Sequence, residues 1–569
     1  MRRASVAGAC LLAIAGAVAA QDKPAAQKPP SGQVGGLHFV DTSEITIVTV
    51  DVSVRDKNGV VLNLKPESFE VYHDGKLQEI ANFSAFVRTQ PTPAPAVSAT
   101  AVPTAAPTPT LAPPAPPSEP RFLVVYVDNE NIMPFNRNRV LTRLNDFLRN
   151  NLRPPDKVMV VSYQRSMKVI QSPTSDVEDA VDALRTLRTY TGGRSDVNSD
   201  RKQLEEYIND NAEQANTLEN AEGRARAFAR EQKNSLTFTV RTIQELVTML
   251  AGVPGRKSII YVSDGLPMSP GLEVFYEIQD RYRDPSSVSQ AAEFESTTLF
   301  RSLVTSAAAA GVTFYTIDAR GLESELGMEA ENRQARSTLS AAIARSNYQD
   351  SLVYMAEQTG GTAIINTNDV AVGLEAIATN LETFYSLGYR LIPSGQDRLH
   401  RVEVRVKGHP EYRLSYRRSF IEKSLPSRVG DQVVSGLVFD PESNVLGIEA
   451  LAGEPSPSSG GRWALPVEIR LPIDKLAMVL DGEELAGYIV AYYAARDDEG
   501  KQSDLQRVEH AVRIPSAEYG KAKGQYYTLT ASLLLEPGNY RLSVGVRDQL
   551  TNQAGFDVVR KAVALETLR

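Results

Sequence analysis

The chain has 569 residues, of which 42% are hydrophobic and 23% are charged, and its formal net charge is -8. This length exceeds that of a domain built around a single hydrophobic core, so several folded domains are expected. The acidic balance provides no basic surface for nucleic acid, and we expect no nucleic-acid binding. The only cysteine is Cys10, so disulfides and thiolate metal sites are not expected in a mature chain.

The first 20 residues have the three parts of a secretory signal peptide. Two arginines precede an apolar run over residues 6–18, and Ala-Val-Ala-Ala follows just before Gln21. An uncleaved anchor and lipidation of Cys10 are the alternatives, but the run is shorter than the roughly 20 residues of a membrane span. We therefore expect an exported protein, periplasmic, at the outer surface or secreted, with no transmembrane segment in the mature chain. Residues 21–37 predict a disordered leader.

Residues 38–88 predict a small, immunoglobulin-like β domain. Valine and isoleucine alternate with polar residues over 45–54, a pattern typical of a strand. Asn58-Gly59 and Asp74-Gly75 are dipeptides that suit tight hairpin turns. The segment 89–120, rich in proline, alanine and threonine, cannot bury a core and predicts an extended linker.

The pattern changes at residue 121, where strands begin to alternate with helices over 121–380. Apolar runs such as FLVVYVD and RKSIIYVSD suit strands that are buried on both faces of a parallel sheet. We therefore expect an α/β domain, with helices on both sides of its sheet. The charged segment 200–233 predicts an exposed helical insertion, which is either a solvated helix or a helix that binds a partner.

Two β regions complete the chain. Residues 381–425 contain strand patterns at hairpin spacing, which predict a β annex that closes the α/β domain or lies beside it. Residues 429–569 alternate apolar and polar side chains between glycine turns and predict a β-sandwich. His400, His409 and His510 lie in or near these segments without the spacing of metal ligands, and we expect them at the surface.

The order of these segments resembles the von Willebrand factor A-related proteins that are abundant in Acidobacteria. The resemblance covers most of the chain, from DKNGVVLNLKPESFEVYHDGKLQEIANFS through the α/β domain to the segments FYSLGYRL and YRRSF. Each motif is weak alone, and their order makes the resemblance specific. Members look like exported proteins of unassigned function. The resemblance implies that the α/β domain is a von Willebrand factor A-like domain with a Rossmann-like, doubly wound sheet.

Such a domain commonly binds a divalent metal through an Asp-x-Ser-x-Ser loop, a threonine from a second loop and an aspartate from a third. In this sequence Asp128 falls at the first aspartate and Asp264 at the third-loop aspartate. Glu130 and Ile132 stand where the two serines belong, so the hydroxyl ligands are missing. The resemblance therefore implies a degenerate metal site.

Other oxygens could complete that site in an altered geometry. Asn129, Glu130 or Asn131 could supply ligands from the first loop, and Thr189, Thr191 or Ser195 from the second. Oxygen ligands would suit Mg²⁺ or Ca²⁺. Aspartates that follow strands also cap the next helix by accepting backbone N–H bonds. A bound metal and a metal-free polar role thus both stay open for Asp128 and Asp264.

The usual catalytic signatures are missing from the sequence. It has neither Gly-x-Ser-x-Gly nor His-Glu-x-x-His, and no nucleophile is recognisable beside a base. We therefore expect a binding protein and not an enzyme, namely an exported interaction or adhesion-type module for a protein or extracellular polymer. The alternatives are a structural or scaffold component of the cell envelope and, more remotely, a hydrolase with an unrecognised site.

Overall fold

The structure, a computed structural model, describes residues 46–87, 120–214, 216–322 and 338–563, all within one compact unit, Ile45–Arg569. The chain is a mixed α/β protein, as expected. The predicted signal peptide, the leader and, except for residue 120, the linker 89–120 lie outside the described residues. Among the described residues, we find no helix with the length and apolar character needed to cross a membrane.

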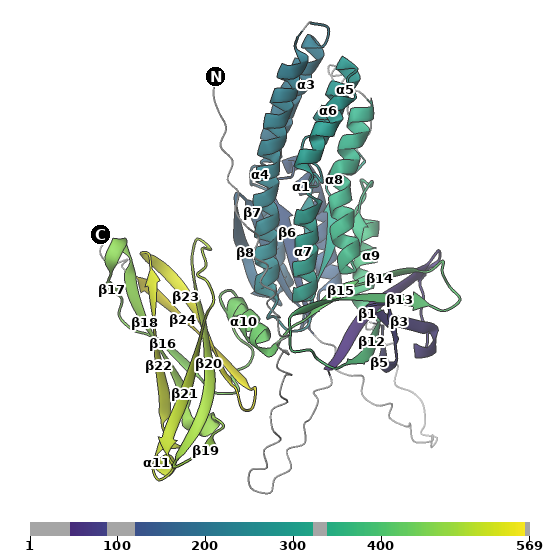
Figure 1. Cartoon of the computed structure of the whole chain (residues 1–569). Helices are drawn as coiled ribbons and strands as arrows, with labels where there is room; N and C mark the ends of the chain where they lie inside the picture. Colours follow the sequence, from purple (N-terminus) through teal and green to yellow (C-terminus); the bar gives the residue numbers. More distant parts are fainter. Residues whose placement is uncertain (1–45, 88–119, 215, 323–337, 564–569) are drawn as a thin grey trace, which may run out of the picture. The chain divides into compact units, whose positions relative to one another are not determined.

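A six-stranded sheet forms the centre of the α/β domain (Figure 1). Its strands lie in the order β11 (Ala363–Ile364), β10 (Val312–Asp318), β9 (Arg256–Ser263), β6 (Arg121–Asp128), β7 (Lys157–Gln164) and β8 (Ser166–Thr174). Neighbouring strands are parallel, except that β7 and β8 are antiparallel. From β6 the chain passes to its neighbour β7, and from β9 it passes to its neighbour β10 on the opposite side, so the winding direction changes between β6 and β9. Open α/β sheets bind ligands at such a switch point, beyond the carboxyl ends of the strands.

Helices cover both faces of this sheet because successive side chains of β6 point to opposite sides. Leu123, Val125 and Val127 pack in one core with α1 (Pro134–Asn151), α2 (Val177–Leu187) and α9 (Ala371–Glu382). Phe122, Val124 and Tyr126 pack in a second core. Its helices are α4 (Leu218–Leu250), α7 (Thr297–Ala310) and α8 (Thr338–Thr359). Burial on both faces explains the continuous apolar run of β6.

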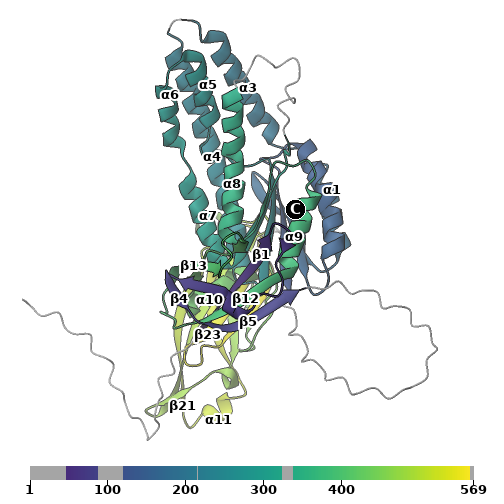
Figure 2. The same cartoon turned by 90° about the vertical axis from the view of Figure 1, so that its right-hand side faces the viewer.

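The predicted helical insertion 200–233 is helical, but it has a core of its own. It falls in α3 (Arg194–Asn211) and the first half of α4, which lie beside α5 (Leu272–Tyr282), α6 (Ser286–Ser289) and η2 (Gln290–Phe294) (Figures 1 and 2). We call this group the helical extension. Its buried side chains include Ile208, Phe228 and Phe275. The expectation of a simply exposed helix was incomplete, because alanines of α4 allow close helix packing that hydrophobic content alone does not reveal.

Residues 46–87 and 383–422 form one β-sandwich, whereas the sequence pattern predicted separate domains for the segments 38–88 and 381–425. One sheet contains β14 (Arg413–Tyr416), β1 (Thr46–Asp56), β12 (Thr383–Leu391) and β5 (Ile80–Val87), with β2 (Gly59–Val60) beside β1. The other contains β15 (Ser419–Glu422), β13 (Arg398–Val406), β3 (Phe69–His73) and β4 (Lys76–Gln78). Both sheets share one apolar core that includes Val52, Val71 and Leu387. The α/β domain is therefore inserted between two halves of this sandwich.

The last region begins with a helix, α10 (Leu425–Gly436), which the strand prediction from residue 429 did not anticipate. Two sheets with a common core follow. The first contains β16 (Glu449–Ala452), β17 (Ser456–Pro457), β18 (Trp463–Pro472) and β22 (Tyr526–Leu535). The second contains β19 (Val479–Asp481), β20 (Glu484–Asp497), β21 (Gln506–Pro515), β23 (Gly538–Asp548) and β24 (Ala554–Val563). The remaining short helices are η1 (Pro66–Ser68), η4 (Ser459–Gly461), η5 (Ile473–Lys475) and α11 (Tyr519–Ala522).

Candidate functional site

The two aspartates that the sequence singles out lie at the carboxyl ends of adjacent strands. Asp128 is the last residue of β6, and Asp264 follows the last residue of β9. Both side chains are buried, with exposures of 0% and 1%. We call the carboxyl ends of β6, β9 and β10, with the loops that follow them, the strand-end edge. The edge contains the switch point of the sheet, where ligand sites of this class of fold lie.

The carboxylate of Asp128 is occupied by donors of the protein itself. The backbone amide of Asn131 donates to Oδ1 at 3.1 Å, and the side-chain amide of Asn131 lies 3.1 Å from both carboxylate oxygens. The hydroxyl of Tyr261 donates to Oδ2. Burial raises the pKa of Asp128 to about 6, and the hydrogen bonds from Tyr261 and Asn131 oppose that rise. The ionised form is thus held by hydrogen bonds in a dry environment.

The carboxylate of Asp264 is engaged in the same way. The backbone amide of Met133 donates to Oδ2 at 2.8 Å, and the side-chain amide of Asn136 donates to both oxygens at 3.1 and 3.2 Å. Burial raises the pKa of Asp264 to about 6, against the attraction of the Arg194 guanidinium. Asp264 therefore holds Met133, the residue just before α1, a helix that precedes Asp264 in the chain.

Arg194 supplies a positive charge from the helical extension. Its side chain is 5% exposed, lies over the ring of Tyr348 at 4.3 Å, and donates to the carbonyl of Gly265 at 3.3 Å. A buried guanidinium close to Asp264 compensates part of the charge that a metal would otherwise balance. This contact links the first residue of α3 to the loop after β9.

The other predicted ligands do not fit a metal site of the kind that the resemblance implies. Ile132 is fully buried in the apolar core, and Asn131 directs its amide group toward Asp128. Thr191 is exposed, and the exposed Ser195 donates its hydroxyl to the carbonyl of Gly192. Glu130 is half-buried and stands at the position of a missing serine. Because N–H groups point at the carboxylates, the donor set does not suit Mg²⁺ or Ca²⁺.

Backbone hydrogen bonds and one buried arginine join the loops of the strand-end edge. The amide of Gly193 donates to the carbonyl of Asn129 at 2.8 Å, and the amide of Asp264 donates to the carbonyl of Asn131 at 2.9 Å. Arg137, with 0% exposure, donates to Asn129 Oδ1 at 2.9 Å and to the carbonyl of Tyr190 at 2.8 Å. These contacts hold the loops in one arrangement, which lowers the conformational cost of binding a partner.

Large apolar side chains are exposed around this rigid edge. Phe135, in the first turn of α1, is 77% exposed, and Leu322, after β10, is 57% exposed. The amide of Leu322 donates to Asn368, so the loops after β10 and β11 meet here. Val372, at the start of α9, is 70% exposed. An aromatic side chain this exposed is available for contact with another molecule.

One sequence expectation about histidines was wrong. His400 has an exposure of only 5%, and it contacts His73, which is 8% exposed. The signal was present in the strand pattern, because His400 shares the inward-facing parity of Val402 and Val404 in β13. Ligand spacing along the chain does not reveal this contact, because the two residues are 327 positions apart.

Comparison with known proteins found no matching family model and no matching curated protein. Among solved structures, BatB from Bacteroides thetaiotaomicron matches at 12% identity and a TM-score of 0.21, covering 46% of this chain and 96% of that chain. An aerotolerance-related membrane protein from Bacteroides fragilis matches at 11% identity and a TM-score of 0.21, covering 46% and 97%. The type V pili tip protein Mfa5 from Porphyromonas gingivalis matches at 10% identity and a TM-score of 0.26, covering 91% and 78%. At such TM-scores these likenesses carry no argument about function.

Proposed function

We propose that this chain is an exported, non-catalytic binding protein with a von Willebrand factor A-like domain. The strand-end edge of that domain binds a protein or extracellular polymer without a metal ion. The two β-sandwiches serve as spacers or accessory binding modules. The order of segments along the chain and the winding of the central sheet support the domain assignment, and the signal-peptide pattern supports export.

The observation that carries the proposal is that protein groups donate to both oxygens of Asp128 and of Asp264, while Phe135, next in sequence to the donor Asn136, is exposed. A partner of a metal-dependent edge completes the coordination of the ion with its own carboxylate. Here both aspartates already hold neighbouring groups, so a partner would contact the outer surface of the loops. An exposed aromatic ring on a rigid edge suits that role, since aromatic side chains supply much of the binding energy in protein interfaces.

Affinity capture with the purified mature chain tests this role. The immobilised chain is incubated with an envelope extract of the source bacterium, with Mg²⁺ and separately with EDTA. The wild-type chain is compared with Phe135→Glu and with Leu480→Glu, a control in β19 of the last region where the side chain is 70% exposed. Both substitutions place the same charge at an exposed apolar position.

We expect the wild-type chain and Leu480→Glu to retain the same partner in both buffers, and Phe135→Glu to retain at least tenfold less, a loss of about 1.4 kcal/mol in binding. Equal retention by all three chains would place the contact elsewhere, as in a scaffold that binds through its β domains. Retention that disappears in EDTA would contradict metal-independent binding.

A further inference from the structure

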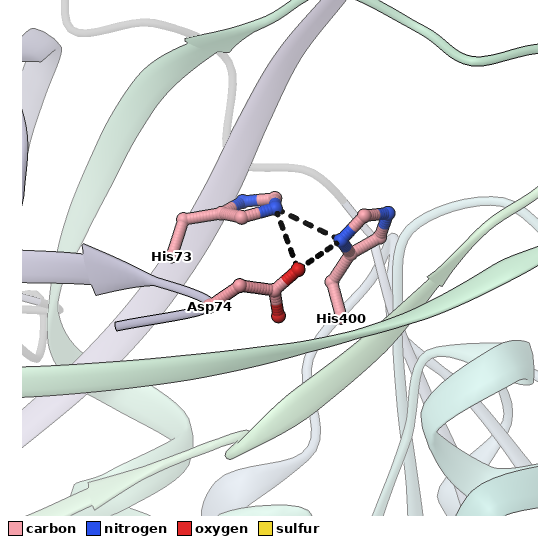
Figure 3. A group of neighbouring side chains, drawn as sticks. All are labelled: His73, Asp74 and His400. Carbon is pink, nitrogen blue, oxygen red and sulfur yellow. Dashed lines mark hydrogen bonds and ion pairs between the residues drawn. The ribbon is translucent and has the colours of Figure 1, made fainter. Parts of the chain in front are cut away.

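A group of metal-ligand side chains lies in the first β-sandwich, away from the strand-end edge. His73 ends β3, Asp74 lies in the following turn, and His400 is in β13. Strands β3 and β13 are antiparallel neighbours, with His73 opposite Val402. Figure 3 shows the three side chains converging from the two strands. Among the described residues, this is the group of three such side chains whose ligand atoms all lie within 4.8 Å of one another.

The spacing of the three atoms suits a small tetrahedral ion. His400 Nδ1 lies 2.9 Å from His73 Nε2 and 2.9 Å from Asp74 Oδ2, and His73 Nε2 lies 3.7 Å from Asp74 Oδ2. A circle through these three atoms has a radius of about 1.9 Å, the same as for three corners of a tetrahedron with bonds of about 2.05 Å. An ion about 2.05 Å from all three atoms would have distorted tetrahedral geometry, and the two separations of 2.9 Å would lengthen toward about 3.3 Å in a regular site.

The atoms on the far side of each ligand are also held as a metal site requires. His400 Nε2 lies 3.2 Å from a Glu422 carboxylate oxygen, and His73 Nδ1 lies 2.8 Å from the Tyr389 hydroxyl. The backbone amide of Arg401 donates to Asp74 Oδ1 at 2.9 Å. If each histidine donates its outer N–H to its partner, both inner nitrogens keep a free lone pair. Hydrogen bonds of this kind orient metal-binding histidines and carboxylates in proteins.

Without an ion, the two contacts of His400 Nδ1 cannot both be complete hydrogen bonds. His400 Nδ1 carries at most one hydrogen, yet it lies 2.9 Å from both the acceptor Asp74 Oδ2 and His73 Nε2, which accepts or donates according to its tautomer. With that hydrogen in place, one of the two contacts is shared or unsatisfied in a nearly buried setting. If the hydrogen is on His73 Nε2 instead, the contact between His400 Nδ1 and Asp74 has none. A cation among the three atoms would satisfy all of them at once.

We propose that His73 Nε2, His400 Nδ1 and Asp74 Oδ2 bind a divalent transition metal of the zinc class, with water in a fourth position. Two imidazoles and one carboxylate suit Zn²⁺ and Co²⁺, whereas Mg²⁺ and Ca²⁺ take oxygen ligands. The side chain of Asp74 is 35% exposed, which gives the fourth position access to solvent.

The bound ion joins two segments that the whole α/β domain separates along the chain. It ties the turn after β3 to β13, so it stabilises the closed sandwich over its open form. The metal thereby stabilises the sandwich into which the α/β domain is inserted. It takes no part in binding at the strand-end edge.

Asp74→Asn is the most informative variant. Asparagine keeps the size of the side chain and tolerates the left-handed backbone at this position, where φ is 47°. It removes the charged ligand without disturbing the two buried histidines. His409→Ala is the matched control, because His409 also pairs with a carboxylate, Glu411, in the same sandwich, but at the surface.

The full mature chain, freed of metal with a chelator, is titrated with ZnCl₂ and with MgCl₂ while thermal unfolding is followed. Co²⁺ absorption provides a second measurement, because four-coordinate Co²⁺ absorbs visible light much more strongly than six-coordinate Co²⁺. We expect Zn²⁺ but not Mg²⁺ to raise the transition midpoint of the wild type and of His409→Ala. In Asp74→Asn, the apparent dissociation constant should rise at least tenfold and the strong Co²⁺ absorption should disappear.

Two outcomes would overturn the site. One is a Zn²⁺ response of Asp74→Asn equal to that of the wild type, which would place the ion elsewhere. The other is a wild type that shows neither a Zn²⁺ shift nor the Co²⁺ absorption. The three residues would then form a hydrogen-bonded cluster in which His400 bridges Asp74 and Glu422.

Discussion

The buried carboxylate of Asp128 makes the stability of the α/β domain depend on pH in a direction that can be calculated. Its pKa rises from an ordinary value of 3.8 to about 6 in the folded chain. The folded state therefore keeps the proton over a range in which the unfolded chain has lost it. The free energy of unfolding must then fall as the pH rises through this range. Stability from this group is fully present below 3.8 and is lost by the time the pH passes about 6.

The magnitude follows from the size of the shift. Each pKa unit corresponds to about 1.4 kcal/mol, so the shift of Asp128 amounts to about 3 kcal/mol. Asp128→Asn removes the titration and keeps the shape. Its neighbours can adapt, because the amide of Asn131 can turn to present its oxygen and the Tyr261 hydroxyl can accept a hydrogen bond. Relative to the wild type, the variant should thus gain about 2–3 kcal/mol between about pH 4 and about pH 8.

Hydrogen exchange of peptides from β6 and β9 measures this difference in the right domain. The single tryptophan, Trp463, lies in β18 and would report on the last region instead. Asp264 titrates in both proteins in the same direction, so its contribution cancels in the comparison. Protection factors, corrected for the intrinsic pH dependence of exchange, give the local free energy of opening.

Parallel pH profiles for the wild type and Asp128→Asn would refute this reasoning, because they would show that Asp128 ionises without a penalty. A second result would refute the metal-free edge. Suppose that Mg²⁺ flattens the pH profile of the wild type and leaves that of the variant unchanged. The Asp128 carboxylate then binds the ion, in place of the hydrogen bonds from Asn131 and Tyr261.

Three further substitutions test other parts of the structure. Leu387 has 0% exposure in the first sandwich, and Leu387→Ala should lower the free energy of unfolding by about 2–5 kcal/mol. Hydrogen-exchange protection should fall in β1 and β12 together. Unchanged protection in β1 would show that the two segments do not share a core. Arg137→Leu removes the donor to the buried Asn129 side chain and to the carbonyl groups of Arg188 and Tyr190. This loss should cost about 1–3 kcal/mol and speed protease cleavage between α2 and α3, whereas cleavage at the wild-type rate would contradict the role of this side chain. Gly265→Ala places a Cβ too close to the carbonyl oxygen of Tyr348, at a φ of 89°. Calorimetry should show a larger loss of stability than for the control Gly395→Ala, where φ is also positive but nothing lies within 4 Å of the new Cβ. Equal losses of stability would mean that the close contact is relieved.

Local patterns in the sequence identify the elements of the α/β domain well. The apolar run before Asp128 and the run before Asp264 became β6 and β9, because a strand buried on both faces needs apolar side chains at every position. The same runs placed the two aspartates at strand ends. Neither the mixed α/β character nor these positions required any knowledge of distant contacts.

Tertiary structure decided which segments pair and what the side chains at the edge hold. Val50 pairs with Leu387 across most of the chain, and alternation shows only which face of a strand is apolar, not which strand lies beside it. The meeting of His73 with His400 has the same cause. The sequence could place Asp128 and Asp264 at one edge, but only the packed loops show that amide and hydroxyl donors fill their oxygens, because those contacts depend on side-chain orientations set by the whole domain.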